Sequence, residues 1–108
     1  MTLWRKRYHE LYEKLKLEHD PRVIQWIGEK EEIIITAPSS SPLLKHKLTG
    51  IRRFKSGKLR ILYALSTEKQ EFWDTPPQIP EVFFLYVDLR TEETYTEALK
   101  LLRKHKVL

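Results

Sequence analysis

Four cationic side chains lie close together in one short segment: Arg53, Lys55, Lys58 and Arg60. Lys and Arg neutralise phosphates, and an Arg guanidinium can donate two parallel hydrogen bonds to one phosphate group. Residues 33–67 contain no Asp or Glu, and seven Lys and Arg side chains lie between residues 45 and 60. This charge pattern predicts a surface that binds a polyanion such as a nucleic acid.

A β-hairpin is expected to position these cations. Residues 57–63 alternate polar and apolar side chains, which is typical of a strand with one buried face. Ser56-Gly57 is a turn dipeptide, and a two-residue loop there fixes the register. The predicted pairs are Lys55 with Lys58, Phe54 with Leu59, and Arg53 with Arg60. Like charges directly opposite each other destabilise a sheet, so their presence favours a function that requires them.

The composition excludes several classes of protein. A chain of 108 residues is expected to form one domain, residues 1–108, and 41% hydrophobic residues argue against disorder. Twenty Lys and Arg against 15 Asp and Glu give a net charge of +5, which suits an acidic partner. The chain has no cysteine, so it has neither disulfides nor thiolate metal sites. It has no apolar run of about 18 residues, so we expect no membrane contact and a cytoplasmic location.

Helices are expected at both ends of the chain. Apolar residues at helical spacing predict a first helix from about Thr2, and Asp20-Pro21 supplies the cap and first-turn proline of a second. Residues 33–36 are either the last turn of that helix or a short strand, and we favour the helix. Residues 66–81, with three prolines, form a long connection in which Trp73 is expected to cover the core. Residues 82–87 then predict a central strand, apolar on both faces, and a closing helix begins near Glu93.

This order of elements predicts an α+β fold. Two N-terminal helices pack on one face of a small antiparallel sheet of three or four strands, and a C-terminal helix closes the chain. The other face of the sheet is expected to stay open and to carry the cations.

Two segments resemble a known family. Residues 47–63 read K-L-T-G-I-R-R-F-K-S-G-K-L-R-I-L-Y, and residues 85–102 read L-Y-V-D-L-R-T-E-E-T-Y-T-E-A-L-K-L-L. In this order they resemble the basic hairpin and the closing strand and helix of the RelE/ParE toxin superfamily of toxin–antitoxin systems. The T-Y-T-E-A-L stretch is especially similar to the RelE branch.

The resemblance implies a RelE-like microbial ribonuclease-type fold and a toxin that inhibits translation. Such a toxin enters the ribosome and cleaves messenger RNA, and its protein partner is a cognate antitoxin. Arg60 matches the family's strand arginine, Arg90 the arginine after the last strand, and Tyr95 the tyrosine that follows. Arg53 and Lys55 match the basic strand more loosely.

The implied chemistry is attack of an RNA 2′-hydroxyl on the adjacent phosphate. Arg60 and Arg90 would clamp the phosphate oxygens as charge develops on them. Tyr95, with a usual pKa near 10, would need neighbouring cations to act as the base. Otherwise it orients the RNA, stacks on a base, or simply packs in the core. The scheme uses no cofactor and no metal, and the four histidines lack ligand spacing.

The departures from the family pattern leave alternatives open. Family members commonly begin with an edge strand, so we expect this sheet to lack one strand. The segment from Arg90 to Tyr95 is one residue shorter than in similar RelE sequences, and the connection at residues 66–81 is longer. A gyrase-inhibiting toxin of the ParE branch and a non-catalytic nucleic-acid-binding relative therefore remain as alternatives. His46, between Lys45 and Lys47, is interpreted as a surface residue.

Overall fold

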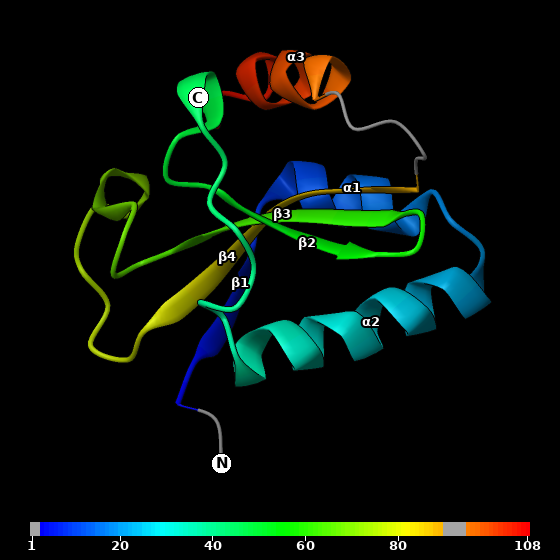
Figure 1. The fold of residues 1–108 in the computed structure, drawn as a ribbon, viewed down its shortest axis with the longest axis horizontal. Coiled ribbons are helices and arrows are strands. Elements are labelled where there is room, and N and C mark those ends of the chain that lie inside the picture. Colours follow the sequence, from blue (N-terminus) through cyan, green and yellow to red (C-terminus); the bar gives the residue numbers. More distant parts are fainter. Residues whose placement is uncertain (1–2, 90–94) are drawn as a thin grey trace.

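The computed structural model describes residues 3–89 and 95–108. Within them, four strands form one sheet in the order β1-β4-β3-β2, and three α-helices pack on it (Figure 1). The strands are β1 (Arg5–Tyr8), β2 (Arg52–Ser56), β3 (Leu59–Leu65) and β4 (Glu81–Leu89). The helices are α1 (Glu10–Leu17), α2 (Pro21–Thr36) and α3 (Thr96–Lys104). Two short 3₁₀ turns, η1 (His46–Leu48) and η2 (Gln70–Phe72), lie in the connections. The predicted α+β class is confirmed.

The predicted first helix is correct only in its second part. Residues 10–17 form α1 as predicted, whereas residues 5–8 form β1, so their prediction as a helix was wrong. β1 pairs in parallel with β4, whereas the other strands are antiparallel, so the sheet is mixed and has the edge strand that we expected it to lack. Trp4, which precedes β1, and Tyr8, its last residue, both pack against the same core cluster. Residues four apart share a face in a strand as well as in a helix, so their spacing cannot separate the two. The pairing with β4 makes residues 5–8 a strand.

The caps of the first two helices follow from local sequence. His9 ends β1 and caps α1, because its Nδ1 accepts a hydrogen bond from the Leu11 amide at 3.1 Å. The Asp20 carboxylate accepts from the amides of Arg22 and Val23 at 2.9 and 3.2 Å, as an N-cap aspartate should. α2 continues to Thr36, so residues 33–36 are helical, as we favoured.

Both faces of the sheet are covered, and the predicted open face was wrong. Tyr12 of α1 and Ile27 of α2 belong to the core on one face, and Ala98 and Leu102 of α3 to the core on the other. Figure 1 shows α3 and α2 on opposite sides of the strands. Residues 82–87 of β4 are all buried, as a central strand that is apolar on both faces requires. The C-terminal helix α3 covers the face of the sheet that was expected to be open.

The connection from residue 66 to 80 packs against the sheet through Trp73. The Trp73 indole donates from Nε1 to Glu81 Oε1 at 2.7 Å, and its ring centre lies 5.6 Å from that of Phe83. The Arg7 guanidinium stacks over Phe83 at 4.4 Å. Trp73 therefore covers the core, as predicted. No helix in the described part of the chain is long and apolar enough to cross a membrane.

Candidate nucleic-acid-binding and active site

The hairpin has a different register from the predicted one. Lys55 pairs with Arg60, Ser56 with Leu59, and Arg53 with Leu62. The two loop residues are Gly57 and Lys58, and Gly57 takes a positive φ of 59° that glycine adopts at low cost. The predicted register was therefore wrong. Because the shift is two residues along the partner strand, every side chain keeps its predicted face.

A row of three charged residues crosses the sheet at the hairpin end. Lys55 on β2 pairs with Arg60 on β3, and Arg60 pairs with Asp88 on β4. The hairpin thus has one facing pair of cations rather than two, and a carboxylate stands on the other side of Arg60. Asp88 accepts hydrogen bonds from the Tyr86 hydroxyl at 2.9 Å and from the Leu89 amide at 2.7 Å. An acid in the row offsets part of the repulsion between the two cations.

Arg60 is buried. The residue is 4% exposed, and its Nη1 donates to the backbone carbonyls of Gly57 at 2.6 Å and Leu59 at 3.1 Å. Arg60 is therefore not a solvated surface residue. These two hydrogen bonds hold the hairpin turn, and the buried positive charge of Arg60 lies across the strand pair from the exposed Lys55.

The other predicted cations are more accessible. Lys55 and Lys58 are exposed, and Arg53 is half-buried on the same hairpin. Arg52 has a different role, because its Nε and Nη2 donate to the Glu68 carboxylate at 2.9 and 2.5 Å. Its Nη1 donates to the carbonyl of Ser41. The hydrogen-bonded Glu68 carboxylate raises the pKa of Arg52. Through Ser41 and Glu68, Arg52 ties β2 to the loops that precede and follow the hairpin.

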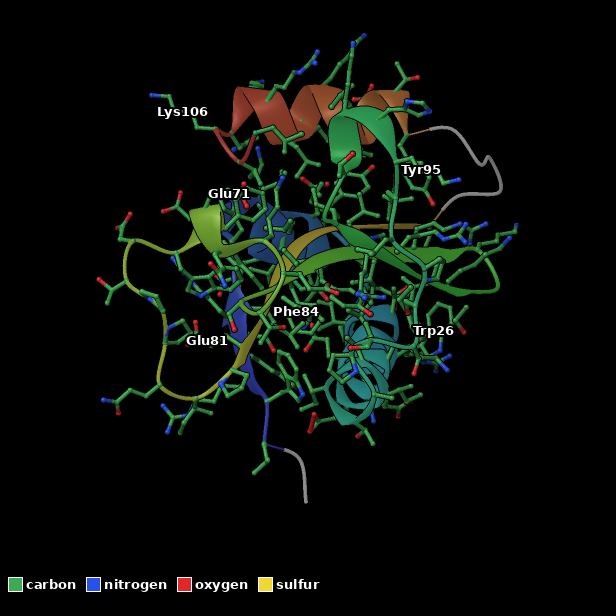
Figure 2. All side chains as sticks on the ribbon, turned by 60° about the vertical axis from the view of Figure 1, so that its left-hand side comes forward. Trp26, Glu71, Glu81, Phe84, Tyr95 and Lys106 are labelled. Carbon is green, nitrogen blue, oxygen red and sulfur yellow. The ribbon has the colours of Figure 1, made fainter. Side chains whose placement is uncertain are left out.

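Tyr95 stands immediately before α3. Its ring packs against the core on the α3 face, yet its hydroxyl is buried and has no hydrogen-bond partner among the described residues. Figure 2 shows the side chain near the start of α3, on the side that faces the sheet. A buried hydroxyl usually has a partner, so pure packing leaves this group unexplained. The catalytic and RNA-orienting roles of Tyr95 remain predictions.

An open groove of about 610 Å³ adjoins Tyr95. It lies between η1 and the first turn of α3, and it is lined by Lys45, His46, Lys47, Leu48, Tyr95, Thr96 and Leu99. Sequence reasoning treated His46 as a surface residue and gave no site role to Lys45 or Lys47. The signal that could have found them was the continuity of the acid-free stretch from residue 33 to residue 67.

Arg90 lies outside the described residues, so its predicted role stays a prediction. β4 ends at Leu89, which pairs with Leu59 beside the hairpin turn. Among residues 3–89 and 95–108, no three His, Asp or Glu side chains form a group that could hold a metal ion.

Two solved structures have the same architecture. A chain of the RelBE2 toxin–antitoxin complex from Mycobacterium tuberculosis matches 85% of this protein and 97% of its own length, with a TM-score of 0.67 and 20% identity. The isolated RelE toxin of E. coli matches 97% of this chain and 99% of its own, with a TM-score of 0.58 and 17% identity. The fold is that of the RelE toxins. No family profile matches the sequence, and no curated protein matches it.

This RelE-like fold confirms the resemblance inferred from residues 47–63 and 85–102 at the level of structure. Both segments lie where the resemblance requires. The first forms the β2–β3 hairpin, and the second contains the end of β4 and the start of α3.

Proposed function

We propose that this protein is the toxin of a type II toxin–antitoxin pair and that it cleaves messenger RNA on the ribosome. The observation that carries the proposal is the buried Arg60, which stands in a row with Lys55 at the hairpin end of a RelE-like sheet. Burying a charge has a large desolvation cost, and this cost is commonly accepted where the charge acts on a ligand.

The proposed reaction is an internal transfer. The RNA 2′-oxygen loses its proton and attacks the adjacent phosphorus, the bond from phosphorus to the 5′-oxygen breaks, and that oxygen takes up a proton. The products are a 2′,3′-cyclic phosphate and a free 5′-hydroxyl. Arg60 and Arg90 stabilise the charge that develops on the phosphate oxygens, and Arg53, Lys55 and Lys58 hold the flanking phosphates. The Tyr95 hydroxyl orients the reacting groups.

An antitoxin protein is the proposed partner. One of the similar structures is a toxin–antitoxin complex. The described part of this chain also exposes several large apolar side chains, among them Leu17 on α1 and Ile33 on α2. Exposed apolar residues on helices suit a protein partner. Co-purification of this chain with the product of a neighbouring small reading frame tests the pairing.

The decisive experiment is induced expression followed by mapping of messenger RNA ends on ribosomes. We expect growth arrest and cuts confined to the ribosomal A site, both lost in Arg90→Ala. The double variant Lys14→Ala/Arg22→Ala, which removes two exposed cations from α1 and α2, is the control and should cut like wild type. Arrest without cuts would instead identify a gyrase-directed toxin, and absence of arrest a binding relative.

A further inference from the structure

The groove between η1 and α3 combines cations and apolar surface. Lys45, His46 and Lys47 are exposed on η1 and the residue before it, whereas Leu48 and Leu99 contribute apolar atoms next to the Tyr95 ring. None of the described residues that line the groove carries a carboxylate. Cations beside an aromatic ring and an apolar surface form the usual combination for a single-stranded nucleotide, whose base stacks while its phosphate meets the cations.

A second groove shows that this composition is not general to the surface. The groove lined by Tyr8, Glu13, Lys16, Leu17 and Ile24 has a volume of about 350 Å³ and also joins an aromatic ring to apolar side chains. Glu13 places a negative charge in its wall. A phosphate would be repelled by Glu13, whereas the charged side chains among the described lining of the groove at η1 are those of Lys45 and Lys47.

The cationic turn is fixed in shape. His46 has a φ of 58°, a left-handed backbone that non-glycine residues adopt rarely. The Thr49 amide and hydroxyl both donate to the His46 carbonyl, at 3.1 and 2.5 Å. Lys69 Nζ, from the 66–80 connection, donates to the Thr49 carbonyl at 3.0 Å. A binding surface ordered in advance loses less entropy when the ligand arrives.

We propose that this groove is a nucleotide subsite of the RNA substrate. This inference rests on the proposed function. The groove holds the nucleotide next to the scissile phosphate. Lys45 and Lys47 contact the phosphate of this nucleotide, and the base lies against Leu99 and the Tyr95 ring. Residues 45–47 thereby extend the cationic surface of the hairpin toward α3. The long 66–80 connection acquires a role as well, because Lys69 supports the turn that carries these residues.

The test is direct binding of a short single-stranded oligoribonucleotide with 2′-O-methyl groups, which cannot be cleaved by 2′-attack. Its fluorescence anisotropy is measured against purified protein over a range of salt concentrations. We expect Lys45→Ala/Lys47→Ala to weaken binding about tenfold at low salt and to flatten the slope of log K against log salt by about 0.7, the contribution of one neutralised phosphate on a single strand. Lys14→Ala/Arg22→Ala removes the same charge elsewhere and should keep the slope.

A variant that leaves the net charge unchanged tests separately whether the nucleotide base occupies the groove. Thr96 is exposed and lines the groove, so Thr96→Trp should fill it without disturbing the core. We expect this variant to weaken binding at least tenfold with an unchanged salt slope. Wild-type binding by Thr96→Trp, or equal effects of the two double alanine variants, would overturn the subsite.

The outcome separates this inference from the proposed function. If wild-type protein cuts messenger RNA on ribosomes and the groove variants cut with unchanged kcat and KM, the subsite is wrong and the function stands. If the groove variants lose binding but the wild-type protein makes no cuts, the nucleotide site stands and the nuclease function fails.

Discussion

Glu31 and Arg60 are both buried, at 1% and 4% exposure, but the protein satisfies their charges in different ways. The Glu31 carboxylate of α2 accepts from the hydroxyls of Tyr8 and Tyr12 at 2.8 and 2.7 Å and from Lys16 Nζ at 2.9 Å. These partners come from β1 and α1. The two carbonyls that Arg60 Nη1 contacts, at residues 57 and 59, belong to its own hairpin.

The difference separates a charge that serves the fold from one that serves a site. Glu31 connects three elements that are distant in sequence, so its removal should loosen the packing of α1 and α2 on the sheet. Arg60 donates to carbonyls of its own hairpin and lies beside Asp88 of β4, at the edge of a cationic surface. We therefore expect substitutions at Glu31 to lower stability and substitutions at Arg60 to lower activity.

The largest expected effect on stability is that of Glu31→Ala. This change removes the acceptor of the buried Tyr12 hydroxyl and of the half-buried Tyr8 hydroxyl, and it removes the carboxylate that pairs with Lys16, so the free energy of unfolding should fall by about 3 kcal/mol. Glu32→Ala is the matched control, because Glu32 is 64% exposed and pairs only with Lys6 among the described ion pairs. Its effect should stay below about 1 kcal/mol. Urea denaturation measures both, and equal losses would remove the distinction between the two carboxylates.

Substitution of Arg60 is expected to lower the cleavage rate strongly and the stability only slightly. Arg60→Lys keeps the charge but loses the planar guanidinium, so cleavage on ribosomes should slow by about 100-fold, as for loss of one group that stabilises transition-state charge. The free energy of unfolding should fall by only about 1–2 kcal/mol, because the hairpin carbonyls lose a donor. Messenger RNA cleavage and urea denaturation are measured on the same preparation. Cleavage at the wild-type rate by this variant would mean that Arg60 only stabilises the hairpin turn.

Tyr95→Phe tests whether the Tyr95 hydroxyl serves stability, as Glu31 does, or activity, as Arg60 does. The hydroxyl has no partner in the described structure, so its removal should not lower stability. If the hydroxyl orients the reacting groups, cleavage should slow at least about tenfold, equivalent to about 1.4 kcal/mol. Single-turnover cleavage rates and thermal unfolding are the measurements. Unchanged rates with unchanged stability would leave Tyr95 as a packing residue.

The smallest expected effect is on alkaline stability. Burial, together with the neighbouring Glu31 carboxylate, raises the pKa of Tyr12 above its usual value of 10. Above about pH 10 the unfolded chain therefore ionises this tyrosine while the folded chain keeps its proton, and stability falls with pH by about 1.4 kcal/mol per unit for this group. Below pH 10 the contribution is fully present. Urea denaturation between pH 9 and 11 should show a shallower slope in Tyr12→Phe; an equal slope would contradict the assignment.

Local sequence predicted those features that depend on near neighbours. The Asp20 cap, the extent of α2 and the buried strand at residues 82–87 each follow from side chains within a few positions of one another. The cationic hairpin was also predictable, because alternation and a turn dipeptide lie within one segment. Its register was not, since both candidate loops contain Gly57 and leave every side chain on the same face.

What the sequence alone determined about this protein is an α+β fold with a cationic hairpin. The tertiary structure decided three further features. Trp4 and Tyr8 fit a helix or a strand equally, and only the free edge of β4 makes residues 5–8 a strand. Packing of α3 closes the face that was expected to be open. That packing also places Tyr95 beside residues 45–47, because side chains about 50 positions apart meet only when the sheet and helices assemble.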